Sequence, residues 1–305
     1  MEQQAGAHKR TSFTGAAGNR IAGDLHEAPD GAPRGAVVLA HGGGQTRHSW
    51  RGTARRLAEA GWLAVTIDQR GHGDSDWIAD GDYSLEAYAD DLAAVAGDIE
   101  DRFGQRPALI GASLGGMAGL VATGRDEPAP ASALVLVDVT PTMKSDGVAR
   151  VLDFMGAHVE EGFSSLEDAA AVISSYLPHR PPPRDLSGLR KNLRLDPDGR
   201  YRWHWDPRFL DARERTDGEG HRPELETRLV AAASRLDLPV LLVRGRESEL
   251  VGEAEARTFL ELVPQARLAD VTGARHMVAG DKNDVFADAV LDFLSDLPAG
   301  AGSLI

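Results

Sequence analysis

The chain has 305 residues, of which 42% are hydrophobic and 26% charged. This length supports a large buried core, and this composition argues against a disordered protein or a coiled coil. Lys and Arg number 33 against 47 Asp and Glu, so the net charge is −14, which argues against nucleic acid or an anionic membrane as the main partner. The absence of cysteine excludes disulfides, Cys-based metal sites and a thiol nucleophile.

The first residues, MEQQAGAHKRTSFTG, contain no apolar run, so we expect no secretory signal. The apolar runs further along the chain are far shorter than the roughly 20 residues that a membrane-spanning helix needs. We therefore expect a cytoplasmic protein whose partner is a small-molecule substrate. Nothing in the sequence predicts an oligomeric state.

Short apolar segments alternate with amphipathic ones along most of the chain. Thr11–Thr14 and Asn19–His26 flank a Gly-Ala-Ala-Gly turn and should pair antiparallel. Six further strands are expected at Ala36–Ala40, Trp62–Ile67, Ala108–Ile110, Ala133–Val137, Val240–Val243 and Arg267–Val271. Because these six lack a polar–apolar alternation, they should be buried on both faces. Strands that alternate with helices predict an α/β fold with a mostly parallel sheet and helices on both faces.

The alternation stops at Pro141 and resumes at Leu238. Helices are expected in between at Gly147–Val159, Ser165–Leu177, Leu186–Leu193 and Pro223–Leu236. We expect residues 141–236 to form a helical cap, inserted after the sixth strand, over a core made of residues 1–140 and 237–305.

A Gly-x-Ser-x-Gly motif, Gly111-Ala112-Ser113-Leu114-Gly115, follows the expected strand that ends at Ile110. A serine on a tight strand-to-helix turn projects its hydroxyl from the carboxyl edge of the sheet, and flanking glycines remove side chains that would clash. This placement predicts Ser113 as a nucleophile.

A glycine-rich turn, His41-Gly42-Gly43-Gly44, follows another expected strand. Such a turn lets backbone N–H groups approach a ligand oxygen, as an oxyanion hole requires. The N–H groups of Gly43 and Leu114 are the expected donors. The chain has neither a Gly-x-Gly-x-x-Gly nor a Walker signature, so phosphate binding is not supported.

His276 follows the last expected strand, in the sequence Thr272-Gly273-Ala274-Arg275-His276. It also comes after the serine motif, in the Ser–acid–His order of one class of hydrolases. We therefore expect His276 to be the general base.

Together, His41-Gly42, the segment Asp68–Ser75, Gly111–Gly115, Val137–Pro141 and Gly273–His276 resemble the α/β-hydrolase family. The resemblance is to its capped branch of esterases, lactonases, perhydrolase-like enzymes and carbon–carbon bond hydrolases, and it covers nearly the whole chain. It implies an eight-stranded sheet, a Ser-His-acid triad, and neither a metal nor an organic cofactor. Many capped relatives carry aspartate at the nucleophile position and open epoxides or displace halide, so Ser113 argues against both reactions.

The triad acid has three candidates. The family usually places it after the strand Val240–Val243, which favours Glu249 and leaves Glu247 as a neighbour that could serve instead. A second family position lies after the preceding strand, where this chain has Asp138. We expect Glu249 to orient His276, with Asp138 as the alternative.

The expected cap contains six bulky apolar residues, Phe154, Met155, Phe163, Tyr176, Trp203 and Trp205. They predict a mainly apolar substrate, with Phe154, Trp203 and Trp205 as binding residues. The expected reaction is hydrolysis of a carboxylic ester or lactone. Cleavage of a carbon–carbon bond, perhydrolysis with the same triad, and a ligand-binding protein without catalysis are the alternatives.

Overall fold

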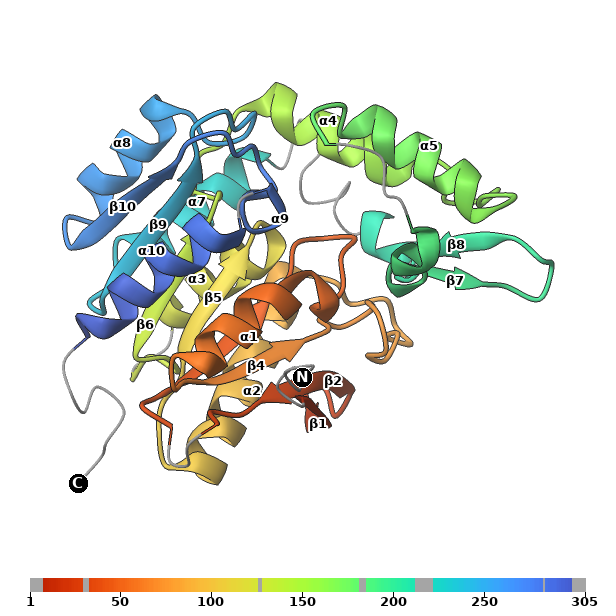
Figure 1. Ribbon diagram of the computed structural model, residues 1–305. Coiled ribbons are helices and arrows are strands. Elements are labelled where there is room, and N and C mark those ends of the chain that lie inside the picture. The colour runs from red at the N-terminus through yellow and green to blue at the C-terminus, as the bar shows by residue number, and fades with distance from the viewer. Residues whose placement is uncertain are drawn as a thin grey trace, which may run out of the picture.

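The computed structural model describes residues 8–29, 33–125, 128–180, 185–211, 222–281 and 283–297. An eight-stranded sheet forms its centre, in the order β1-β2-β4-β3-β5-β6-β9-β10 (Figure 1). The strands are β1 His8–Thr14, β2 Arg20–His26, β3 Ala36–Ala40, β4 Leu63–Ile67, β5 Ala108–Ala112, β6 Ala133–Val137, β9 Val240–Gly245 and β10 Ala266–Val271. β2 is antiparallel to both β1 and β4, and every other pair is parallel. The predicted α/β fold with its mostly parallel sheet is confirmed.

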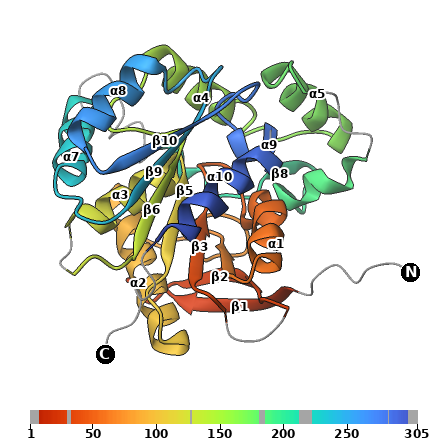
Figure 2. The ribbon, with the colours of Figure 1, turned by 60° about the vertical axis from the view of Figure 1, so that its left-hand side comes forward.

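Helices cover both faces of this sheet (Figure 2). The helices outside the inserted segment are α1 Arg51–Glu59, α2 Leu85–Phe103, α3 Leu114–Arg125, α8 Glu253–Leu262, α9 Val278–Asp281 and α10 Asn283–Ser295, and the 3-10 helix η1 Arg47–Trp50 precedes α1. Side chains of α1 and α10 pack on one face of the sheet, and side chains of α2, α3 and α8 pack on the other. The central strands are fully buried, as their continuous apolar sequences require.

Residues 141–236, which we call the insert, connect β6 to β9. The insert contains α4 Ser145–Gly156, α5 Leu166–Tyr176, the 3-10 helix η2 Leu186–Lys191, β7 Leu193–Leu195, β8 Tyr201–Trp203 and α7 Arg222–Ala233. Two features differ from the predicted helical cap. A short antiparallel pair, β7–β8, forms around the turn at residues 196–199. The last helix, α7, packs closely against α3, since a Cβ on Gly124 would lie 2.2 Å from the Ala232 carbonyl oxygen.

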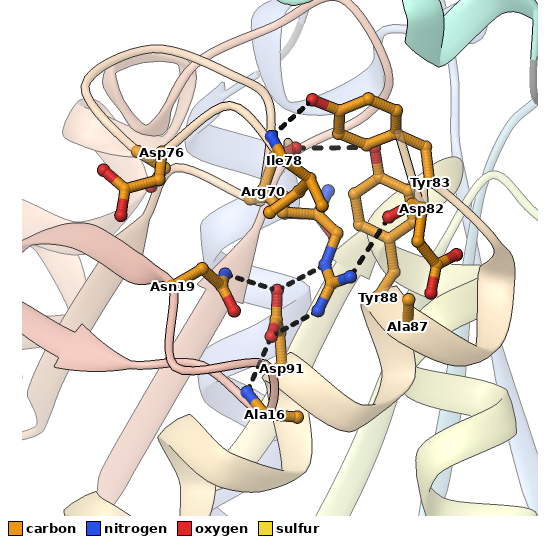
Figure 3. Close-up of polar contacts among 12 residues, drawn as sticks. Ala16, Asn19, Arg70, Asp76, Ile78, Asp82, Tyr83, Ala87, Tyr88 and Asp91 are labelled. Carbon is orange, nitrogen blue, oxygen red and sulfur yellow. Dashed lines mark hydrogen bonds and ion pairs between the residues drawn. The ribbon is translucent and has the colours of Figure 1, made fainter. Parts of the chain in front are cut away.

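A buried ion pair joins the loop after β4 to α2 (Figure 3). Arg70 donates two hydrogen bonds of 2.7 Å to the carboxylate of Asp91. The same carboxylate accepts from the backbone N–H of Ala16 at 2.9 Å and from the Asn19 amide at 3.2 Å, so it also ties the β1–β2 turn to α2. Because a buried charge is stable only when it is paired and hydrogen-bonded, this network holds the loop after β4 in one position.

The helices of the described ranges include none that is both long and apolar enough to cross a membrane.

Candidate active site

Ser113 lies on a strained turn between β5 and α3. Its φ angle is 47°, in the left-handed region that side chains other than glycine rarely adopt. The backbone around it is tightly packed: a Cβ on Gly111 would lie 2.3 Å from the Gly115 carbonyl, and a Cβ on Gly115 would lie 2.4 Å from the Ala40 carbonyl oxygen. Both glycines of the motif are therefore required by close backbone contacts. Strain held in place in this way is typical of a functional position.

The turn after β3 lies against this serine. A Cβ on Gly42 would be 3.4 Å from the Cβ of Ser113. The Gly42 N–H donates to Gln45 Oε1 at 3.3 Å, and the Gly44 N–H donates to His72 Nε2 at 3.1 Å. In the described part of the chain, the N–H groups of Gly43 and Leu114 have no acceptor. These are the two donors expected from the sequence for an oxyanion hole.

The ring of His41 makes polar contacts that hold the same turn in place. It is fully buried; its Nδ1 lies 2.8 Å from the Gly42 carbonyl oxygen, and its Nε2 accepts from the Gln69 N–H at 3.1 Å. Burial lowers the pKa of His41 to about 4, although the Gly42 carbonyl opposes this shift. The imidazole is therefore neutral at pH 7, with Nδ1 as its donor and Nε2 as its acceptor.

His276 is partly buried and contacts a carboxylate. Its Nδ1 lies 2.9 Å from Oδ2 of Asp138, which follows β6. An ionised carboxylate only accepts hydrogen bonds, so Nδ1 carries the proton and Nε2 is left as the basic nitrogen. This is the tautomer that a general base needs.

Asp138 is fully buried and has a φ angle of 50°. Its Oδ1 accepts from the Gly245 N–H at 3.1 Å, and its Oδ2 accepts from the Ser248 hydroxyl at 2.5 Å as well as from His276. Burial raises the pKa of Asp138 above its usual value, and the hydrogen bonds from His276, Ser248 and Gly245 oppose that rise. These donors stabilise the charged form in a site that excludes water.

The loop that carries His276 packs on the end of β9. A Cβ on Gly245 would lie 2.4 Å from the Arg275 carbonyl oxygen, and the Glu247 N–H donates to the Ala274 carbonyl at 3.0 Å. The backbone of Asp138 is also joined to β9, because its N–H donates to the Val243 carbonyl at 2.8 Å. The end of β9 therefore brings the histidine loop and the residue after β6 together.

The structure does not place Glu249, the expected triad acid, against His276, whose ring contacts Asp138 instead. The charge of Glu249 acts on Tyr176 of α5, where burial and the Glu249 carboxylate raise the pKa of the phenol to about 12. Its backbone carbonyl supports the start of α4, since a Cβ on Gly147 would lie 2.2 Å from that oxygen. Glu249 is therefore directed toward the insert. Glu247 is exposed, and neither glutamate has a hydrogen bond to His276 among the described residues.

Ser248, which lies between these two glutamates, is a site residue that the sequence reasoning missed. It is buried, and its hydroxyl contacts the Asp138 carboxylate, which also contacts His276. The available signal was a small polar residue at the turn where the family usually keeps its acid. Sequence alone gave no reason to look for a hydroxyl there.

Ser113 and His276 line one cavity of about 340 Å3, which also includes Gly43. Most of the remaining lining is apolar and comes from the insert, including Val148, Phe154, Met155, Ile173, Trp203 and Trp205. The three expected binding residues, Phe154, Trp203 and Trp205, thus all face the cavity. Phe163 does not line it; this side chain is fully buried and packs on Trp203 at a ring-centroid distance of 5.1 Å.

Within the described ranges, His, Asp and Glu side chains do not gather in any group of three or more that could hold a metal ion.

A family model described as serine aminopeptidase, S33, matches residues 31–283. The chain belongs to the α/β-hydrolase superfamily. It is 30% identical over 233 residues to esterase Rv0045c of Mycobacterium tuberculosis, which covers 73% of this chain and 70% of the relative. It is 32% identical over 236 residues to 2-(acetamidomethylene)succinate hydrolase of Mesorhizobium japonicum, with 76% and 78% covered.

Solved structures agree with this assignment. The crystal structure of E-2-(acetamidomethylene)succinate hydrolase superposes with a TM-score of 0.76 at 22% identity and covers 95% of this chain and all of its own. A structure of the esterase Rv0045c superposes with a TM-score of 0.73 at 26% identity, with 97% and 94% covered. The chain is a serine hydrolase of the α/β-hydrolase fold.

Proposed function

We propose that this hydrolase cleaves a carboxylic ester or lactone of a mainly apolar small molecule, with Ser113 as nucleophile, His276 as general base and Asp138 as the acid of the triad. The contact between His276 Nδ1 and Asp138 Oδ2 is the observation that carries the proposal. It sets the histidine tautomer at the cavity that also holds the strained Ser113.

In the proposed reaction, Ser113 Oγ attacks the carbonyl carbon while Nε2 of His276 takes the hydroxyl proton. Asp138 stabilises the imidazolium that results. The N–H groups of Gly43 and Leu114 donate to the negative oxygen of the tetrahedral intermediate. When this intermediate collapses, the protonated His276 gives its proton to the departing alkoxide. Water then attacks the acyl-enzyme with His276 again as base, and the acid and free Ser113 are released.

The size and lining of the cavity support a small, mainly apolar substrate. A volume of about 340 Å3 lies at the lower end of the range for small-molecule sites, and most side chains of the insert that face it are apolar. The esterase among the relatives supports ester cleavage. We propose that the insert acts as the cap that selects the acyl or alcohol group.

The test is covalent labelling with a fluorophosphonate, which reacts with activated serines and requires no knowledge of the natural substrate. We expect a single adduct on Ser113 by mass spectrometry, and turnover of p-nitrophenyl esters that falls about 10⁴-fold in Ser113→Ala with unchanged thermal stability. A Ser113→Ala variant that keeps full esterase activity would contradict the proposal.

The same preparation separates the alternatives. A panel of esters, lactones and β-diketones, together with carboxylate plus hydrogen peroxide, distinguishes hydrolysis from carbon–carbon cleavage and from perhydrolysis. Absence of both labelling and turnover would instead support a ligand-binding protein without catalysis.

A further inference from the structure

The hydroxyl of Ser248 has only one direction in which it can donate. Its oxygen accepts from the N–H of Leu250 at 3.0 Å and from the N–H of Val251 at 3.1 Å. A serine hydroxyl has two lone pairs and one proton, so both acceptor positions are occupied. The proton is left for Oδ2 of Asp138, at 2.5 Å.

The position of Ser248 is itself held by the turn after β9. Its backbone N–H donates to the Gly245 carbonyl at 3.0 Å, and the Gly245 N–H donates to the other oxygen of Asp138 at 3.1 Å. Ser248 is 8% exposed and Asp138 is fully buried, so this contact is largely shielded from solvent. The carboxylate thus accepts hydrogen bonds at both oxygens from one four-residue turn, Gly245–Ser248.

We propose that Ser248 is a positioning residue of the triad, whose hydroxyl keeps the carboxylate of Asp138 charged and its Oδ2 directed at the His276 ring. The inference rests on the proposed function. The turn after β9, where the family usually keeps its triad acid, would then supply a hydrogen-bond donor to the acid, and the carboxylate itself would come from the residue after β6.

A physical reason for this role is the burial of Asp138, which favours its neutral form. The titratable groups that act on it are His276 and Arg244, and the Arg244 guanidinium is itself held by two hydrogen bonds, of 2.8 and 2.7 Å, to Asp270. Without the Ser248 donor, Asp138 should take up a proton at higher pH. A neutral Asp138 no longer stabilises the imidazolium, so the variant should lose activity at low pH before it loses activity near neutral pH.

The test compares Ser248→Ala, Ser248→Thr and a matched control, Ser75→Ala. Ser75 is equally buried, accepts from the Ala22 N–H at 2.8 Å and donates to the Asp68 carbonyl at 2.6 Å, but it lies outside the proposed triad. Both alanine variants lose a buried serine that binds backbone, so both should lose thermal stability. Only Ser248→Ala should change the chemistry.

The readouts are the rate of fluorophosphonate labelling of Ser113 as a function of pH and the downfield proton NMR signal of His276 Nδ1–H. In Ser248→Ala we expect labelling to slow about 10- to 100-fold, the range for losing one hydrogen bond to a buried charge. We also expect the acidic limb of the pH profile to move to higher pH and the NMR signal to shift. Ser248→Thr, which retains the hydroxyl, should restore most of the rate.

A Ser248→Ala variant with the wild-type pH profile and NMR signal, or with a loss no greater than that of Ser75→Ala, would overturn the inference. Asp138→Asn, measured alongside, separates this result from a failure of the proposed function. If Asp138→Asn is inactive while Ser248→Ala is normal, only the role of Ser248 is wrong. If Asp138→Asn is also normal, the triad itself is wrong.

Discussion

The wall of the cavity that belongs to the sheet and the wall that belongs to the insert differ in what holds their side chains in place. On the sheet side, hydrogen bonds connect Asp138, His276 and Ser248, and glycine contacts fix the turn of Ser113. On the insert side, rings hold one another: Phe154 stacks on Tyr176 with centroids 3.9 Å apart and meets Trp203 edge-on at 5.8 Å.

This difference fits two different tasks. Hydrogen bonds are directional and hold reacting groups within a few tenths of an ångström, which general base catalysis requires. Aromatic and aliphatic packing is less directional, so its side chains can be exchanged for others of similar volume at modest cost. The comparison predicts that changes on the sheet side alter the rate, and that changes on the insert side alter the choice of substrate.

The largest effect is expected from Asp138→Asn. An amide in place of the carboxylate cannot stabilise the imidazolium and favours the wrong histidine tautomer, so kcat/KM for a p-nitrophenyl ester should fall about 10⁴-fold, as in a well-studied triad. Steady-state kinetics on folded protein measures this. The matched control is Glu249→Gln, which removes a charge in the loop after the neighbouring strand β9. Its kcat/KM should stay within about twofold of wild type. A large loss of kcat/KM in Glu249→Gln with near wild-type activity in Asp138→Asn would contradict the proposed role of the sheet side.

A smaller effect should appear in stability as the pH falls. His41 is buried neutral on the sheet side with a pKa of about 4, whereas in the unfolded chain it titrates near 6.5. The unfolded state therefore binds the proton first, and stability present above pH 6.5 should be lost as the pH approaches 4. The loss attributable to His41 is about 3 kcal/mol, at about 1.4 kcal/mol per pKa unit.

Urea unfolding at a series of pH values between 7 and 4 measures this loss. His41→Asn serves as the comparison, because its stability should depend less on pH over this window even though it is lower at pH 7. Burial raises the pKa of Asp138, so this residue contributes stability as the pH falls, which is opposite to the effect of His41. It is present in both proteins. Identical pH slopes for wild type and His41→Asn would show that the sheet side does not owe its acid sensitivity to this histidine.

The smallest effect is expected from Phe154→Ala on the insert side. Removing this ring enlarges the apolar part of the cavity, so preference between short and long acyl p-nitrophenyl esters should shift about tenfold toward the longer ones, or about 1.4 kcal/mol. The fluorophosphonate labelling rate should remain within about twofold, because the triad is untouched. Phe163→Ala, at a buried ring that does not line the cavity, is the control and should change stability without changing preference.

Much of the fold followed from the sequence because the central strands of the main sheet are apolar runs bounded by turn residues. Ala36–Ala40 and Ala133–Val137 were predicted with their observed ends, since both are buried along their whole length. The β7–β8 pair was missed because three-residue strands such as Leu193–Leu195 are too short to show a period.

The site was less predictable than the fold. The strain at Ser113 and the contacts of Gly111 follow from a local motif, so the sequence could indicate them. The choice between Asp138 and Glu249 could not be made locally, because both follow neighbouring strands at the same edge of the sheet. The contact of Gly245 with the Arg275 carbonyl and the occupation of the turn by Ser248 decide which carboxylate reaches His276, and both depend on three segments far apart in the chain.

The close packing of α7 on α3 bears on how this enzyme could diversify or be engineered. α7 is the last helix of the insert in the sequence, but it packs as part of the core. Leu229 and Ala233 are buried, and Ala232 lies where a side chain on Gly124 of α3 would clash. A chimera that exchanged all of residues 141–236 would strip α3 of its cover and expose apolar surface, whereas a graft that ends before Arg222 would leave that layer intact. Since Leu225 and Leu229 also line the cavity, such a graft would inherit part of its substrate preference from the recipient.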